Sequence, residues 1–224
     1  SPVSEADYAA NKVLEDVLRK ARPNYGWLSE ETEDDAERLS SDTLFIIDPI
    51  DGTRAYLAGK DTWCVSVAVV HGGRPVAGAI VAPVFREEFT ALSGAQAFKN
   101  GDELRLSARE PSQLTLGVTQ ELSKKLSPDL LARADIAAHV PSLAYRLAMV
   151  GDGRLDATLV RPYSNDWDLA AADLIIERAG GLLTHRDGSI LTYNRKSVEH
   201  PFLCAASSAV MPTILSGMSA KPSG

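Results

Sequence analysis

Two aspartates stand three residues apart in the segment Asp48-Pro49-Ile50-Asp51-Gly52-Thr53, directly after an apolar, β-rich run at residues 43–47. The run predicts a buried strand, and Pro49 is expected to end it because proline cannot donate to a strand ladder. Gly52 permits a tight turn, on which both carboxylates can converge on one point. Carboxylates this close repel each other unless a cation neutralises them, and all-oxygen ligands suit a hard ion, with Mg²⁺ as the first candidate.

The plainer interpretation is a turn in which Asp48 and Asp51 only accept hydrogen bonds from backbone amides. Short motifs often match by chance, so an isolated segment of this kind would favour the plainer interpretation. Other acids change the balance. Glu30 and Glu31 directly follow the apolar pair Trp27-Leu28, as ligands held at the end of a strand would.

Asp168 is a further acid in a position to contribute. It lies in the first turn of a predicted helix that begins after Asn165 and ends at Gly180. Capping and the helix dipole would explain a carboxylate there without any metal. Trp167 beside it is large enough to fix the helix start by burial, and a rigid carboxylate at a helix N-terminus can present itself to an ion.

The elements that must position these acids follow from the apolar spacing. Residues 6–21 repeat at helical spacing, and Ser4 and Asp7 stand before them in a capping-box relation, for which capping alone is a sufficient reason. After the central segment, hairpin patterns predict a largely antiparallel sheet. Its expected strands are residues 63–70, 76–82 and 88–92.

The second half alternates strand and helix patterns, which predicts a layered α/β (α+β) protein. The hairpin pattern gives way to the alternating pattern around residues 109–112. We therefore expect one catalytic domain, 1–224, with a boundary between a metal-binding half, 1–110, and a substrate half, 111–224. Strands are expected at residues 114–118, 155–160, 182–184 and 202–206, and helices at residues 128–134, 142–150 and 165–180.

The composition is that of an ordinary globular protein: 224 residues, 45% hydrophobic and 24% charged. A net charge of −7 argues against a nucleic-acid-binding surface, and no apolar run approaches the ~20 residues that span a bilayer. Two distant cysteines, Cys64 and Cys204, favour a reducing cytoplasm. The chain opens at Ser1-Pro2 without a methionine, which leaves a missing N-terminal segment open, and the tail at residues 221–224 is expected to be disordered.

The histidines and Cys64 suggest no nucleophile. Cys64 lies in an expected strand and reads as a small core residue. The spacing of the four histidines matches no catalytic arrangement, so they are expected to be ordinary surface or turn residues. They are His71, His139, His185 and His200.

Four segments, in this order, resemble the magnesium-dependent, lithium-sensitive phosphatases of the inositol monophosphatase family, and the resemblance covers essentially the whole chain. The two signature segments are residues 48–53 and Trp167-Asp168-Leu169-Ala170-Ala171-Ala172. Weaker matches are Ser4-Glu5-Ala6-Asp7, where the family usually has Thr first, and Ser29-Glu30-Glu31, where it usually has Gly first. The resemblance implies a layered α-β-α-β-α sandwich of inositol monophosphatase/fructose-bisphosphatase type and a homodimer.

The resemblance also implies ligands for two Mg²⁺ ions. Glu30, Asp48 and the Ile50 carbonyl would hold the first. Asp48, Asp51 and Asp168 would hold the second, and Asp51 and Asp168 would also face the substrate. One bound ion can lower the pKa of a water that attacks the phosphate, and the other can stabilise the departing alkoxide, so no protein nucleophile is needed.

The same resemblance implies roles for the neighbours of these acids. Asp7 and Thr53 would orient the attacking water. Glu31 would support a third, weaker ion through water. The backbone amides of Gly52 and Thr53 would receive phosphate oxygens.

Substrate choice depends on other positions. Seven residues before Asp168 the inositol phosphatases carry Glu, and this chain has Arg161. In the middle helix they usually have Asn where this chain has Arg146, and just before that helix they usually have Gly where it has Pro141. Guanidinium groups bind phosphate bidentately, so two extra cations suit a second phosphate.

The expected substrate is therefore a 3′(2′),5′-bisphosphate nucleotide such as adenosine 3′,5′-bisphosphate. Inositol 1-phosphate is the close alternative and histidinol phosphate the third. A non-catalytic, RNA-associated role is a different class, opposed by the full set of acids and by the net charge. The competing interpretation of Arg146 and Arg161 is that they are solvated or paired with Asp152 or Asp156.

Overall fold

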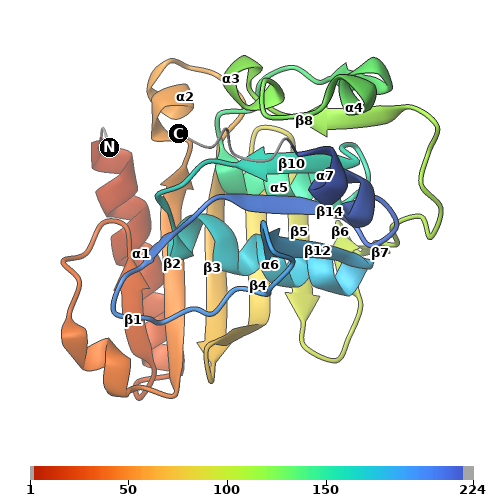
Figure 1. The fold of residues 1–224 in the computed structure, drawn as a ribbon. Helices are drawn as coiled ribbons and strands as arrows, with labels where there is room; N and C mark the ends of the chain where they lie inside the picture. The colour runs from red at the N-terminus through yellow and green to blue at the C-terminus, as the bar shows by residue number, and fades with distance from the viewer. Residues whose placement is uncertain (1–2, 219–224) are drawn as a thin grey trace, which may run out of the picture.

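The computed structural model describes residues 3–218 and places the first half of the chain in a seven-stranded sheet (Figure 1). Its strands neighbour one another in sequence order; β1 and β2 are parallel, and all later pairs are antiparallel, as the hairpin pattern predicts. They are β1 (Gly26–Ser29), β2 (Thr43–Asp51), β3 (Cys64–His71), β4 (Arg74–Ala82), β5 (Glu87–Leu92), β6 (Ala97–Lys99) and β7 (Asp102–Glu103).

A second, mixed sheet of five strands lies in the other half, in the order β12-β14-β10-β8-β9. Its strands are β8 (Leu114–Gly117), β9 (Ala134–Ile136), β10 (Ala157–Val160), β12 (Gly181–His185) and β14 (Leu203–Ser207). A short antiparallel pair, β11 (Ser164–Asn165) and β13 (Glu199–His200), stands apart from both sheets.

Helices separate and cover the sheets, which confirms the predicted α-β-α-β-α layering (Figure 1). The helix α1 (Glu5–Ala21) packs on β2, the helices α5 (Leu143–Gly151) and α6 (Asp166–Ala179) lie between the sheets, and α7 (Met211–Gly217) packs on β14. Shorter helical segments are η1 (Ala36–Ser40), α2 (Thr53–Leu57), α3 (Gln120–Ser123) and α4 (Pro128–Ala132). No helix within residues 3–218 combines the length and apolar character needed to cross a membrane.

The helix α6 approaches the first sheet closely because small residues meet there. A Cβ on Gly78 of β4 would stand 3.0 Å from the carbonyl oxygen of Ala171, so only glycine allows this contact without movement. Ala170, Ala171 and Ala172 are all fully buried on the helix. This packing brings the N-terminal end of α6 beside the end of β2.

The prediction that Pro49 ends the strand is wrong, because β2 continues through Asp51. Asp48 pairs with Ser66 and Asp51 with Cys64, so three steps along β2 match two along β3. This bulge tolerates a residue without an N–H group. In a regular strand residues three apart point to opposite faces, whereas the extra residue lets both acids face one side.

Other expectations differ in detail. The helix expected at residues 128–134 ends at Ala132, because the chain enters β9 at Ala134. The sequence pattern gave no sign of α2 and α7, which are only five and seven residues long and therefore too short to show helical periodicity. The tail expected to be disordered, residues 221–224, lies outside the described residues.

Candidate active site

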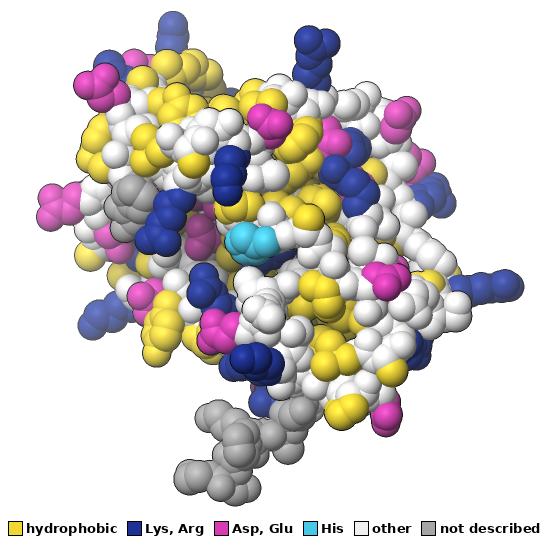
Figure 2. Space-filling model, turned by 90° about the horizontal axis from the view of Figure 1, so that it is seen from above, with side chains coloured by type: hydrophobic (Ala, Val, Ile, Leu, Met, Phe, Trp, Pro, Cys, Tyr) yellow, Lys and Arg dark blue, Asp and Glu magenta, His cyan; other side chains and the backbone are white. Residues whose placement is uncertain are grey.

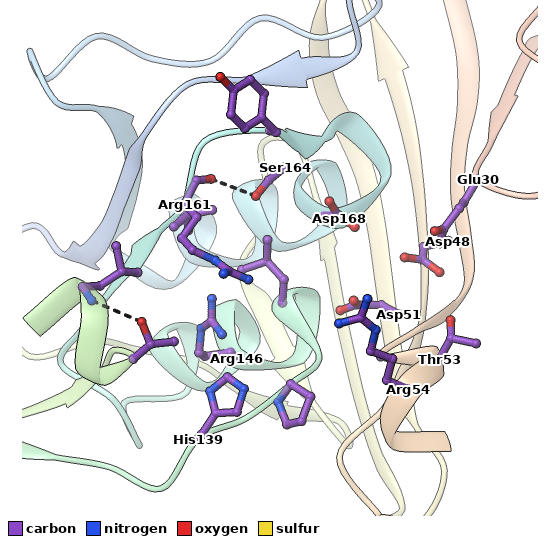
Figure 3. A pocket seen from close by; sticks show the side chains of 17 residues that line it. Glu30, Asp48, Asp51, Thr53, Arg54, His139, Arg146, Arg161, Ser164 and Asp168 are labelled. Carbon is purple, nitrogen blue, oxygen red and sulfur yellow. Dashed lines mark hydrogen bonds between the residues drawn. The ribbon is translucent and has the colours of Figure 1, made fainter. Parts of the chain in front are cut away.

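Three carboxylates converge where β2 ends and α6 begins. Oxygen atoms of Asp48, Asp51 and Asp168 all lie within 4.8 Å of one another (Figure 3). Two come from the bulged end of β2 and the third from the first turn of a helix 115 residues further on. The close packing of α6 on the first sheet, at Gly78 and Ala171, brings them together.

Asp168 is held by the start of its own helix. Asn165 is the N-cap, and Asp168 Oδ2 accepts a hydrogen bond from the backbone N–H of Asn165 at 2.7 Å, which completes a capping box. The other carboxylate oxygen is not used in this contact. Capping and ligation are therefore compatible at this residue.

Asp51 is held by the start of α5. Ser142 Oγ donates to Asp51 Oδ2 at 2.6 Å, and the backbone N–H of Ala144 donates to the same oxygen. Ser142 is fully buried and caps α5 through the Tyr145 amide. Sequence reasoning did not assign Ser142 a role. Its N-cap position was visible, but nothing local indicated that it would reach Asp51.

Glu30 and Glu31 follow β1, as expected, and the two differ in placement. The backbone N–H of Glu30 bonds to the Ile47 carbonyl at 3.2 Å, which extends the pairing of β1 with β2. Glu30 lines the same cavity as the three aspartates but stands outside their tight group. Glu31 is half-buried and is not among the residues that line the cavity.

The electrostatics of these acids favour a bound cation. Burial raises the pKa of Glu30 to about 7, with Glu31, Asp51 and Asp7 adding to the effect. The pKa values of Asp48 and Asp168 are both raised well above the usual range of an aspartate. Burial is the larger cause, and the charge of Asp51 is the second. Such a group is unfavourable when ionised unless positive charge is supplied. The all-oxygen donor set fits a hard divalent ion.

Thr53 and Asp7 are brought together beside this cluster. Thr53 Oγ lies 3.0 Å from the Ile50 carbonyl oxygen and 3.2 Å from Asp7 Oδ1, and both side chains are buried. Asp7 is anchored by the capping box with Ser4. Gly52 adopts φ +94° between Asp51 and Thr53, where a Cβ would come within 3.2 Å of the Ser142 side chain.

The acids form one side of a cavity of about 560 Å³, and cations form much of the other side (Figure 3). On the face shown in Figure 2, Lys and Arg side chains surround a hollow in which acidic side chains are visible. The cavity is lined by Glu30, Asp48, Asp51, Gly52, Thr53, Arg54, Thr119, Leu122, His139, Pro141, Leu143, Arg146, Val160, Arg161, Tyr163, Ser164 and Asp168.

Arg146 and Arg161 both line the cavity, and the acids proposed as their surface partners are engaged elsewhere. Asp152 forms ion pairs with Lys99 and Arg154. Asp156 Oδ2 accepts from the Thr115 amide at 2.7 Å.

Arg146 Nε and Nη1 donate to Thr158 Oγ1 at 3.1 Å and to the Val140 carbonyl at 3.0 Å. Burial lowers the pKa of Arg146, while the charge of Asp51 raises it. Arg161 is exposed at the rim. The two guanidinium groups therefore face the same cavity from its wall and its rim.

Sequence reasoning missed several residues of the cavity. Arg54, His139 and Tyr163 line it, and none was assigned a role. The signal for Arg54 was its position directly after the central segment. His139 and Tyr163 stand in irregular segments, so no periodicity could point to them.

The expectation that all four histidines are surface or turn residues is wrong for His200. His200 is 2% exposed, and its Nε2 lies 2.7 Å from Oδ1 of the fully buried Asp166. The expectation that Cys64 is a small core residue is confirmed, since it is fully buried.

Known proteins resemble this chain in sequence and fold. A family model described as "Inositol monophosphatase family" matches residues 1–219. The Nus factor SuhB of Xylella fastidiosa is 34% identical over 195 residues, which are 83% of this chain and 70% of that protein. An inositol-1-monophosphatase of Rhizobium meliloti is 34% identical over 195 residues, or 83% of this chain and 73% of that protein. The crystal structure of the suhB protein of Bartonella henselae superposes with a TM-score of 0.84 at 29% identity, covering 99% of this chain and 87% of that one.

Proposed function

This chain belongs to the inositol monophosphatase family, a family of phosphatases, and from that premise we propose that it hydrolyses a small phosphate monoester with Mg²⁺ as its cofactor. The carrying observation is the group of three converging carboxylates, Asp48, Asp51 and Asp168, opposite Arg146 and Arg161 in one cavity. Acids alone would repel a phosphate dianion. Bound cations at the acidic end and guanidinium groups at the other make the cavity suitable for anions.

The metal assignments of the family fit the positions of these residues. Glu30, Asp48 and the Ile50 carbonyl would hold one Mg²⁺, and Asp48, Asp51 and Asp168 a second. When bound, such ions neutralise the phosphate and activate a water without a protein nucleophile. The chain's contribution is to hold the oxygens rigidly, which the capping box on Asp168 and the Ser142 bond to Asp51 support.

Water positioning falls to Asp7 and Thr53. The Thr53 hydroxyl lies between the Ile50 carbonyl and Asp7, so it has an acceptor for its proton and can accept from a water with its oxygen. Glu31 would act further out, through water, on a third and weaker ion. The amides of Gly52 and Thr53 would receive the phosphate oxygens.

The substrate we favour is a 3′(2′),5′-bisphosphate nucleotide, because two guanidinium groups face the cavity beyond the metal end. Inositol 1-phosphate is the second candidate, supported by the inositol-1-monophosphatase among the similar proteins. Histidinol phosphate is a third candidate. A purely RNA-associated role gains no support from a net charge of −7. A homodimer and a cytoplasmic location are part of the same proposal.

One assay tests the proposal. Phosphate release is measured from adenosine 3′,5′-bisphosphate, inositol 1-phosphate and histidinol phosphate in parallel, with Mg²⁺ and with excess chelator. We expect Mg²⁺-dependent release with the highest kcat/KM for the bisphosphate. Release that persists in chelator would contradict the metal assignment. A higher kcat/KM for inositol 1-phosphate would make that compound the substrate and would leave the proposed reaction, metal-dependent phosphate release, unchanged.

A further inference from the structure

Asp166 and Asp168 occupy the same first turn of α6 but face opposite ways. Residues two apart on a helix differ by about 200° around its axis. Asp168 therefore lines the cavity, whereas Asp166 is fully buried behind it and lines no part of it. A buried acid with no place in the cavity needs another role.

Both carboxylate oxygens of Asp166 are occupied by a loop that comes from far along the chain. Oδ1 lies 2.7 Å from His200 Nε2, and Oδ2 accepts from the backbone N–H of Asn194 at 3.0 Å. A carboxylate oxygen accepts a hydrogen bond, so the contact suits the His200 tautomer that has its proton on Nε2. The backbone N–H of Asp166 itself bonds to the Val198 carbonyl at 3.0 Å. The helix start is thus fastened to residues 194–200 at three points.

Asn194 extends this connection to the segment that leads into β2. Its Nδ2 donates to the carbonyls of Arg38 at 3.1 Å and Ser41 at 3.3 Å, and its Oδ1 accepts from Arg38 Nη1 at 2.8 Å. Ser41 stands two residues before β2, the strand that carries Asp48 and Asp51. Asn194 has φ +57°, a conformation that asparagine tolerates better than most residues.

The same loop also holds the rim of the cavity. In the β11–β13 pair, Ser164 stands opposite His200, and the backbone N–H of Tyr163 donates to the His200 carbonyl at 2.8 Å. Tyr163 and Ser164 both line the cavity. Asp166 therefore sits where β2, α6 and the cavity rim are tied together.

We propose that Asp166 is a positioning residue. Its bonds to His200 and Asn194 fix the start of α6 relative to β2 and so set the place of Asp168 beside Asp48 and Asp51. This inference rests on the proposed function of the site as a metal centre. It predicts that breaking the Asp166 contacts weakens cation binding without removing any ligand.

The test measures Mg²⁺ affinity directly, by titration calorimetry on the purified chain, alongside kcat and KM. Asp166→Asn places its side-chain NH₂ group against one of the two donors, His200 Nε2 or the Asn194 backbone N–H. His200→Leu removes the first of these donors and keeps the charge of Asp166. We expect each to weaken Mg²⁺ binding about 10–100-fold, the usual cost of losing a partner behind a metal ligand. His200→Gln, which keeps a side-chain N–H donor, should restore binding to within a few-fold of the parent.

The matched control is Asp173→Asn, which disrupts another buried acid of the same helix. Asp173 bonds to Arg74 at 2.8 Å and to the Tyr193 hydroxyl at 3.0 Å, away from the cavity. We expect it to leave Mg²⁺ affinity unchanged.

The inference is overturned if Asp166→Asn and His200→Leu fold and bind Mg²⁺ as the parent does. It is also overturned if only Asp166→Asn weakens binding, because the lost charge would then explain the effect. If Asp166→Asn does not fold, the comparison of His200→Leu with His200→Gln decides. A parent chain that binds no Mg²⁺ would instead overturn the proposed function, and this inference with it.

Discussion

Ser142 Oγ lies 2.6 Å from Asp51 Oδ2, although 91 residues separate them in the chain. The contact joins the N-cap of α5 to the bulged end of β2. Burial raises the pKa of Asp51, and the Ser142 hydrogen bond acts against this by stabilising the ionised form. The hydroxyl thus orients Asp51 and favours its ionised form, which is the form that the proposed metal role requires.

Ser142→Ala should therefore weaken the site without deleting a ligand. We expect the Mg²⁺ concentration for half-maximal activity to rise about tenfold or more. Ser142→Thr, which keeps the hydroxyl, is the control in an Mg²⁺ titration of phosphatase activity. An unchanged titration for Ser142→Ala would mean that the Ala144 amide alone holds Asp51.

Metal removal should affect stability as well as activity. The acids with raised pKa values repel one another, so a bound cation stabilises the fold by about 2.7 kcal/mol at a concentration 100 times its Kd. We expect chelation to abolish activity and to lower the thermal midpoint, and Mg²⁺ to restore both. Asp48→Asn should remove the Mg²⁺-dependent shift, because Asp48 is the proposed ligand of both ions. A shift that survives in this variant would place the bound ion elsewhere.

Thr53→Ala should lower kcat and leave KM nearly unchanged, because a water-orienting hydroxyl acts mainly in the transition state. Positioning of this kind accounts for about 10²–10⁴-fold in rate. Steady-state kinetics on the preferred substrate measure the effect, and Thr53→Ser, which keeps the hydroxyl, is the control. Near-normal kcat in Thr53→Ala would reduce Thr53 to a structural residue of the turn.

Arg161→Glu should change substrate preference. It removes an attraction for a second phosphate and adds a repulsion, and a charge-assisted hydrogen bond contributes roughly 1.5–3 kcal/mol. At about 1.4 kcal/mol per tenfold, kcat/KM for adenosine 3′,5′-bisphosphate should fall at least tenfold, while that for inositol 1-phosphate should hold or improve. Arg109→Glu, an exposed charge reversal outside the cavity lining, is the control. If the ratio of the two values does not move, Arg161 does not contact the substrate.

Asp173 should make stability depend on pH. Burial raises its pKa to about 6, against the opposing effect of Arg74. Above about pH 4 the unfolded chain releases this proton, whereas the folded chain keeps it up to about pH 6. The stabilisation of the folded state by the bound proton is therefore complete below about pH 4 and is lost as pH rises through 6. Over that interval the free energy of unfolding of the parent should fall by up to about 3 kcal/mol relative to that of Asp173→Asn. Urea unfolding of both proteins across the interval measures it, and parallel stability curves would contradict the raised pKa.

The sequence by itself determined the features that depend on near neighbours. The capping boxes at Ser4 and Asn165, the glycine that ends α6 and the hairpins of the first sheet all rest on residues within a few positions of one another. Such contacts depend little on how distant segments of the chain are arranged. The family resemblance rests on the same kind of local segments, which is why the family and the layered fold could be predicted.

Only the tertiary structure decided the contacts across the chain. The Ser142 bond to Asp51, the His200 contact with Asp166 and the exposure of Arg146 and Arg161 to one cavity each join distant segments. They depend on strand register and on how closely α6 packs against the sheet, which local patterns do not encode. Pro49 shows the reason in one residue. Its missing N–H forbids a regular ladder, but only the pairing of β2 with β3 decided that the strand would bulge and continue instead of stopping.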